Sequence, residues 1–228
     1  MNLPACSMRW RTVADTAELQ QTACRRIVDA AGRAVNQRGE FLIVLAGGNT
    51  PRGIYQRLRK ESCDWLRWKV YFGDERCLPA DDPQRNSKMA ADAWLDHTPI
   101  PKGNVHAIPG ELGARAAALA YIDTLRAVRE FDLVLLGLGE DGHTAGLFPG
   151  HEWGTAPHAP DVLAVFDSPK PPQQRVSLSA ARLSRTREVL FLVAGESKRT
   201  AAERWRAGER LPAAAIHSPA GIDVLISN

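Results

Sequence analysis

The stretch LVLLGLGEDGHTAGLFPG, residues 133–150, joins a continuous apolar run to a glycine-rich loop. The run does not alternate with polar residues, which is typical of a strand covered on both faces of a parallel sheet. Gly137, Gly139 and Gly142 then spell G-x-G-x-x-G, the pattern of a dinucleotide-binding loop. The stretch therefore predicts a buried strand, and its loop has two interpretations: a cofactor fingerprint, or a turn that presents His143 for chemistry.

Further apolar runs predict a sheet built from similar strands. The expected strands occupy residues 41–46, 68–73, 132–138, 162–167, 188–194 and 222–227. Helical patterns lie between them, at residues 15–38, 111–130 and 198–206. The first begins with Asp15 and Glu18 in capping-box spacing and ends before Gly39. This alternation predicts an α/β fold of the Rossmann-like, doubly wound type, with a mostly parallel sheet and helices on both faces.

Composition limits the class of protein. The 228 residues suit one domain, 1–228, and a net charge of +3 with dispersed basic residues argues against a nucleic-acid partner. Cysteines stand at positions 6, 24, 63 and 77 without a C-x-x-C pair or a zinc pattern. The start of the chain does not have the layout of a signal peptide, and no apolar run reaches the length of a membrane span. We therefore expect a cytoplasmic protein with free thiols, no membrane partner and no metal.

The loop at 137–150 fits a dinucleotide fingerprint poorly. That fingerprint needs a long helix starting at its glycines, because the pyrophosphate sits on the helix N-terminus. Here only HTAGLF precedes Pro149 and Gly150, and the loop follows the third expected strand, not the first. The alternative is a turn that places Asp141 and His143 at the edge of the sheet, where an acidic neighbour can fix the imidazole tautomer. His143 could instead cap a short helix or fill a polar niche.

Two other loops leave the ends of expected strands: AGGNTPRG, and GDERCLP at residues 73–79. AGGNTPRG, residues 46–53, leads into a helix with Pro51 in its first turn, and the N–H groups of residues 48–50 can bind an anion. The loop has no P-loop lysine, which favours a sugar phosphate over a nucleoside triphosphate, and an ordinary strand-to-helix turn is the alternative. If the sheet is parallel, both loops converge on the crevice that holds His143.

Charged residues in three further parts of the chain are candidates for that crevice. Asp74, Glu75 and Arg76 follow the second expected strand, and an arginine there could pair with a phosphate or an oxyanion, although a solvated charge cluster is the usual explanation. Arg175 ends the proline-rich segment 168–175, and Lys198 opens a helix. By themselves these two residues are weak signals.

Taken together, these residues resemble the 6-phosphogluconolactonase family along nearly the whole chain. The stretches that carry the resemblance are AGGNTP, GDERCLPADDPQRNSKMA, LVLLGLGEDGHTAGLFPG, SPKPPQQRVSLS and VAGESK. The first two loops are shared with the related glucosamine-6-phosphate deaminases. In the deaminase an acidic residue follows the loop histidine five positions later, and here that position is Phe148. The form of the loop favours the lactonase.

The resemblance implies hydrolysis of 6-phospho-D-glucono-1,5-lactone to 6-phosphogluconate, the second step of the oxidative pentose phosphate pathway. It implies that His143 activates water, that Asp141 orients it and that Arg76 stabilises the oxyanion. It also implies a set of substrate and phosphate contacts, made up of Gly47, Gly48, Asn49, Thr50, Asp74, Arg175 and Lys198. No cofactor is implied, and water is expected to attack directly, because neither a G-x-S-x-G elbow nor a Cys–His pattern is visible.

The sequence departs from the family pattern at three positions. Asn49, Arg85 and Gly146 each stand where the family commonly has serine. The first removes a hydroxyl from the phosphate loop but leaves its backbone donors, and the other two touch no assigned role.

Two alternatives to the lactonase remain open at this point. One is an enzyme like the deaminase/isomerase, and the other is a non-catalytic sugar-phosphate sensor. An added DNA-binding segment would favour the sensor, and we see none in the sequence. The oligomeric state stays open.

Overall fold

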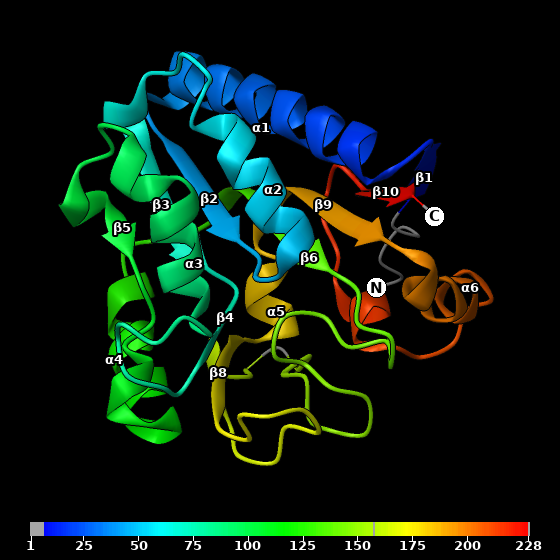
Figure 1. The fold of residues 1–228 in the computed structure, drawn as a ribbon. Coiled ribbons are helices and arrows are strands. Elements are labelled where there is room, and N and C mark those ends of the chain that lie inside the picture. Colours follow the sequence, from blue (N-terminus) through cyan, green and yellow to red (C-terminus); the bar gives the residue numbers. More distant parts are fainter. Residues whose placement is uncertain (1–6, 157, 228) are drawn as a thin grey trace.

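The computed structural model describes residues 7–156 and 158–227, and within them a seven-stranded sheet forms the centre of the fold (Figure 1). All neighbouring strands of this sheet are parallel. In order across the sheet the strands are β1 (Met8–Val13), β10 (Ile222–Ser227), β9 (Thr186–Ala194), β6 (Phe131–Gly137), β2 (Phe41–Leu45), β3 (Trp68–Phe72) and β5 (Val105–His106). Cys6 lies outside the described residues, and so do the other residues of 1–6, where a signal peptide would begin.

A second, antiparallel sheet branches from the first. Its strands, in order, are β4 (Asp74–Arg76), β8 (Arg175–Leu178) and β7 (Val162–Val165). The two sheets meet at Gly73, whose N–H donates to the Leu45 carbonyl at 3.0 Å while its own carbonyl accepts from the Leu178 N–H at 2.8 Å. The chain therefore passes from β3 directly into the small sheet.

Helices flank the parallel sheet. They are α1 (Thr16–Arg38), α2 (Asn49–Leu58), α3 (Asn86–Ala93), α4 (Ala114–Leu125), α5 (Ala180–Leu183) and α6 (Arg199–Arg206). Short 3-10 helices are η1 (Trp65–Arg67), η2 (Leu95–His97), η3 (Lys102–Asn104), η4 (Gly110–Leu112), η5 (Glu196–Lys198) and η6 (Pro212–Ala215). Figure 1 shows α1 and α2 on one side of the sheet and α4, α5 and α6 on the other. The expected α/β fold with a mostly parallel sheet is confirmed.

The amino-terminal helix α1 begins and ends where its sequence predicts. The Glu18 N–H donates to Asp15 Oδ1 at 2.8 Å, and Glu18 Oε2 accepts in return from the Ala14 N–H at 2.7 Å. The helix ends at Gly39, whose φ of 79° is left-handed. Its buried face includes the apolar positions spaced four residues apart, Leu19, Ala23, Ile27 and Ala31.

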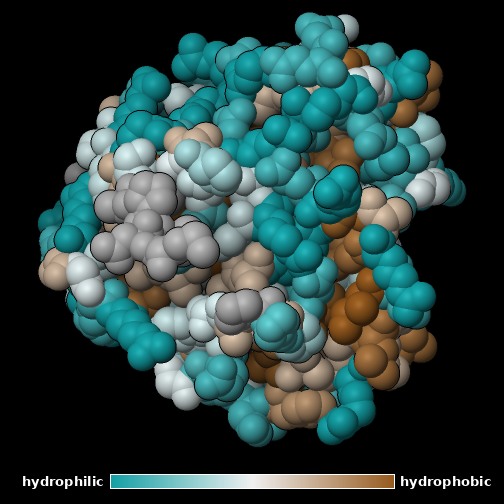
Figure 2. All heavy atoms as spheres, turned by 180° about the vertical axis from the view of Figure 1, so that it is seen from behind, coloured by the Kyte–Doolittle hydropathy of each residue, from teal (hydrophilic) through white to brown (hydrophobic). Residues whose placement is uncertain are grey.

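Aromatic side chains fill the core at both ends of the sheet. Trp68 of β3 packs edge-on against Trp94, with ring centroids 5.6 Å apart, and Trp205 of α6 packs on Phe191 of β9 at 4.6 Å. On the outside, apolar side chains gather over α4, where Leu112, Leu119 and Phe166 are exposed (lower right in Figure 2). No helix among the described residues has the length and apolarity needed to cross a membrane.

Two sequence predictions need correction. The run at 162–167 is not a strand of the parallel sheet: it forms β7, which pairs antiparallel with β8 in the small sheet. The helix expected at 111–130 is shorter, because Gly113, with a φ of 79°, separates η4 from α4, and the chain turns after Leu125. Four strands were not predicted. They are β1, which is an edge strand with mostly exposed side chains, and the short strands β4, β5 and β8.

The cap of α1 provides a test of the fold. Asp15→Ala should lower the free energy of unfolding by about 1 kcal/mol, because the Glu18 N–H loses its acceptor. Urea unfolding followed by circular dichroism measures the change. The matched control is Asp29→Ala at an exposed position inside the same helix, where alanine should stabilise slightly because it is the better helix former. Equal losses in the two variants would contradict the capping role.

Candidate active site

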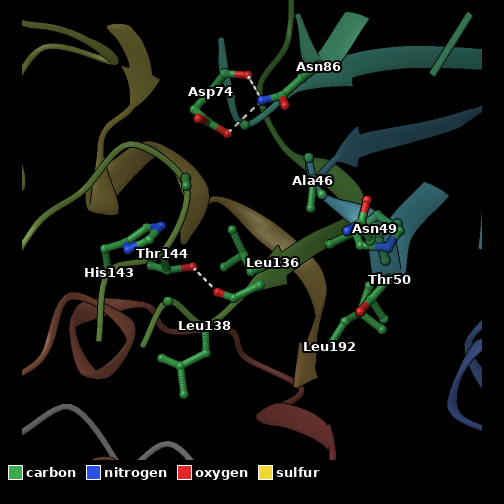
Figure 3. Close-up of a pocket in the computed structure, with 18 of the residues that line it drawn as sticks. Ala46, Asn49, Thr50, Asp74, Asn86, Leu136, Leu138, His143, Thr144 and Leu192 are labelled. Carbon is green, nitrogen blue, oxygen red and sulfur yellow. Dashed lines mark hydrogen bonds between the residues drawn. The ribbon is translucent and has the colours of Figure 1, made fainter. Parts of the chain in front are cut away.

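A cavity of about 400 Å³ lies at the carboxyl ends of β2, β3, β6 and β9 (Figure 3). It is lined by nine of the ten residues that the sequence singled out: Gly47, Gly48, Asn49, Thr50, Asp74, Arg76, His143, Arg175 and Lys198. The tenth, Asp141, bonds to His143. The expected convergence of the strand-end loops on one crevice is therefore confirmed.

His143 and Asp141 form a short contact inside the loop after β6. The Nδ1 atom of His143 lies 2.5 Å from Asp141 Oδ1, and the side chains are 21% and 33% exposed. Burial acts to raise the pKa of Asp141, but the hydrogen bonds and charge of His143, together with the charge of Lys170, outweigh burial, so that the pKa is lowered. An ionised carboxylate on Nδ1 leaves Nε2 as the nitrogen that can accept a proton from a ligand or water.

The backbone of this loop is shaped around the pair. A Cβ atom at Gly139 would lie 2.0 Å from His143 Nδ1 and 2.5 Å from Asp141 Oδ1, so the close approach requires glycine. The Gly139 N–H donates to the His143 carbonyl at 2.7 Å, and Thr144 Oγ1 donates to the Gly137 carbonyl at 2.8 Å. Residues 139–150 contain no helix, so the alternative that His143 caps a short helix is wrong.

The loop after β2 presents the amino-terminal end of α2 to the cavity. Gly48 is the N-cap residue, with a φ of 105°, and no side chain caps the first turn. The N–H groups of Asn49 and Thr50 belong to that first turn, where an α-helix has no backbone acceptors of its own. The ten-residue helix thus offers unpaired donors and the positive end of its dipole to an anion.

Asp74 begins β4 of the small sheet, next to its junction with the parallel sheet, and lies at the top of the view in Figure 3. It is buried, and Asn86 Nδ2 donates to its Oδ1 at 3.2 Å and to its carbonyl oxygen at 2.9 Å. Burial raises the pKa of the Asp74 carboxyl, while the guanidinium groups of Arg76 and Arg175 act in the opposite direction. The carboxyl is therefore fixed in position beside the cavity's cations.

A buried carboxylate holds the backbone of the segment that carries Arg76. Glu75 is fully buried, and its Oε1 accepts from the N–H groups of Arg76 at 2.8 Å and Asn86 at 2.7 Å. The Arg76 Nη1 donates to the Gln84 carbonyl, and its buried Nε has no hydrogen-bond partner in the described part of the chain. One donor of Arg76 is therefore still available inside the site.

Arg85 completes this network from the other side. Its Nε lies 3.1 Å from Glu75 Oε2, and its Nη1 donates to Glu111 Oε2 at 2.8 Å. Nη1 and Nη2 also donate to the carbonyls of Leu78 and Ile108. Arg85 is only 2% exposed, so it ties the segment after Arg76 to the loop that precedes α4.

Arg175 reaches the cavity from β8, where it pairs with Arg76 across the small sheet. Its Nε and Nη2 donate to the carbonyls of residues 170–172, at 3.1–3.3 Å, and its guanidinium lies 5.6 Å from the centre of the Phe148 ring. Burial lowers the pKa of Arg175, while the charge of Asp74 raises it. The proline-rich segment is thus the loop of the β7–β8 hairpin, and its backbone carbonyls orient Arg175.

Several functional neighbours were missed by the sequence reasoning. Asn86 and Glu140 line the cavity, and Glu75 and Arg85 support Arg76. Arg85 and Gly146, two of the departures from the family pattern, lie next to groups that shape the site. Arg85 pairs with the carboxylate that holds Arg76, and a Cβ atom at Gly146 would lie 2.8 Å from Ser177 Cβ and 3.5 Å from Asp74 Cβ. In the sequence Arg85 follows Asp81 and Asp82, and nothing in that pattern marks it as a buried residue.

Comparisons with known proteins give the family and the fold. The sequence model of the family described as glucosamine-6-phosphate isomerases/6-phosphogluconolactonase matches residues 14–225. A 6-phosphogluconolactonase of Mycobacterium tuberculosis is 40% identical over 198 residues, which cover 81% of this chain and 80% of that protein.

Solved structures show the same fold. A crystal structure of 6-phosphogluconolactonase from Thermotoga maritima has a TM-score of 0.89 at 26% identity, covering 97% of this chain and all of the other. A monomeric glucosamine-6-phosphate deaminase has a TM-score of 0.83 at 22% identity over 97% of this chain and 98% of the other, which is a likeness of fold alone.

The Glu75 network provides the next test. Glu75→Gln should lower the free energy of unfolding by about 3 kcal/mol, because it removes the charge that faces the buried Arg85. The control is Glu111→Gln, which changes the other partner of Arg85; that carboxylate is 42% exposed and should be worth less than about 1 kcal/mol. Denaturant unfolding of the two variants gives both values. A loss no larger at Glu75 than at Glu111 would show that the buried pair is not the anchor.

Proposed function

The chain belongs to the family of glucosamine-6-phosphate isomerases and 6-phosphogluconolactonases, and from this premise we propose that it hydrolyses 6-phospho-D-glucono-1,5-lactone to 6-phospho-D-gluconate. The observation that carries the proposal is the short His143–Asp141 contact at a cavity that also holds Arg76. Enzymatic hydrolysis of a phosphorylated lactone requires only one base, one site for the oxyanion and one site that binds the phosphate.

The proposed reaction begins with water activated by His143. Nε2 takes a proton from water while Asp141 holds the ring through Nδ1, and the oxygen of that water attacks the lactone carbonyl carbon. Arg76 stabilises the tetrahedral oxyanion, and its buried Nε without a partner supports this role. The intermediate then collapses with cleavage of the bond to the ring oxygen, which receives the proton from the imidazolium. One water is consumed and the ring opens to the acid.

The phosphate is proposed to bind at the amino-terminal end of α2. The N–H groups of the loop at residues 47–50 supply neutral donors, and a sugar phosphate brings about −1.5 to −2 charges near neutral pH. Lys198 and Arg175, which line the same cavity, are the cations proposed to balance that charge. Because two of the Arg175 donors are held by loop carbonyls, we assign the larger part of this role to Lys198.

Phe148 favours a lactonase over a deaminase. It occupies the position where the deaminases have an acidic residue, is buried, and lies 5.0 Å from the His143 ring between centroids. No carboxylate can act at that position in ring opening. We also infer a cytoplasmic location, supported by the free thiols of Cys24, Cys63 and Cys77. We infer a single domain as well, supported by the one hydrophobic core that the described elements share.

A pair of assays on the purified protein tests the proposed function. With freshly formed 6-phosphogluconolactone, release of 6-phosphogluconate should far exceed spontaneous hydrolysis. With glucosamine 6-phosphate, no ammonia should be released. Ammonia release without lactone hydrolysis would replace the proposal by a deaminase, and binding of sugar phosphates without either reaction would indicate a sensor.

The proposed base gives a prediction for kcat. His143→Ala should lower kcat by about 10²–10⁴-fold and leave KM within several-fold, because a general base acts mainly in the transition state. Steady-state kinetics on the phosphorylated lactone provide both constants. The control is His151→Ala: His151 is exposed and does not line the cavity, so its variant should keep wild-type kinetics. A folded His143 variant with near wild-type kcat would remove His143 from the mechanism.

A further inference from the structure

The cation proposed for the phosphate forms an ion pair with an acidic side chain of the cavity. Lys198 Nζ lies 3.4 Å from Glu140 Oε1, and this carboxylate lines the same cavity. Glu140 belongs to the loop after β6 that carries His143, whereas Lys198 ends η5 after β9. The ion pair therefore bridges two of the loops between which a substrate phosphate would lie.

The carboxylate of Glu140 is held by more than Lys198. A hydrogen bond from Ser197 and the charge of Lys198 lower the pKa of Glu140, so that it is ionised at neutral pH. Ser197 also lines the cavity. A phosphate oxygen would bind in the same way, by accepting hydrogen bonds from a hydroxyl group and an ammonium group.

Exposure shows that the pair can open. The Glu140 side chain is 56% exposed and that of Lys198 is 26% exposed, so the carboxylate can turn into solvent while the ammonium stays in the site. Lys170 also lies near enough to lower the pKa of Glu140, so a second cation attracts a displaced carboxylate. A phosphate dianion carries more charge than a carboxylate and can also accept hydrogen bonds from the N–H groups of α2. It can therefore displace Glu140 from Lys198.

From these contacts we propose that Glu140 pairs with the ammonium group of Lys198 and competes with the substrate phosphate for it. The inference rests on the proposed function, in which Lys198 meets that phosphate. Glu140 is thereby a specificity-determining residue. A ligand that carries phosphate displaces it, and an unphosphorylated lactone leaves the Glu140–Lys198 pair closed.

The test measures the affinity of inorganic phosphate by calorimetry and as competitive inhibition of lactone turnover. Glu140→Gln should tighten phosphate binding by about three- to tenfold, because it removes both the competitor for Lys198 and a repulsive charge. The KM for unphosphorylated glucono-1,5-lactone should stay unchanged. Glu196→Gln is the matched control: it removes one charge two residues from Lys198, where the carboxylate pairs with Arg199, and should change phosphate affinity less than twofold.

A double-variant cycle separates competition from simple repulsion. In a Lys198→Gln background, Glu140→Gln should improve phosphate affinity by less than twofold, because there is no ammonium left to release. An unchanged or weaker affinity in the single variant, or an equal gain with and without Lys198, would overturn the inference. Since calorimetry needs no turnover, inactivity on both lactones would overturn the proposed function alone.

Discussion

Two backbone hydrogen bonds at Gly73 determine where the site can form. Through them the carboxyl end of β3 is bonded to β2 on one side and to β8 of the small sheet on the other. Asp74 and Arg76 follow immediately, and Arg175 lies opposite Arg76 on β8. The cations and the buried carboxyl of the cavity thus take their positions from the junction of a parallel and an antiparallel sheet.

Neighbouring acidic side chains balance the charges of the cations in the cavity. Glu140 faces Lys198, and Asp74 lies beside Arg76 and Arg175. Because a half-buried charge without a partner is costly, each cation has an anion nearby. The pairs differ in burial: the Glu75–Arg85 pair is almost fully buried and serves the fold, whereas the Glu140–Lys198 pair reaches solvent and can exchange partners.

The sequence predicted the parallel sheet because its strands are continuously apolar, and it predicted α1 because Asp15, Glu18 and Gly39 mark its ends. It missed β4 and β8 because three or four residues carry no periodic signal, and it placed β7 in the wrong sheet because an apolar run does not encode its partner. The site loops were predicted from glycines and charges next to strand ends. Arg85 and Glu140 were missed because their roles depend on contacts with residues distant in the chain.

The hydrogen bonds between Arg175 and the β7–β8 hairpin loop limit how this part of the protein can change in evolution. The guanidinium is oriented by carbonyl oxygens of residues 170–172, groups that every amino acid possesses. Selection on the orientation of Arg175 therefore acts on the path of the backbone, which Pro171 and Pro172 restrict, and only weakly on exposed side chains elsewhere in the loop. Exposed side chains elsewhere on this hairpin can vary while the arginine keeps its place.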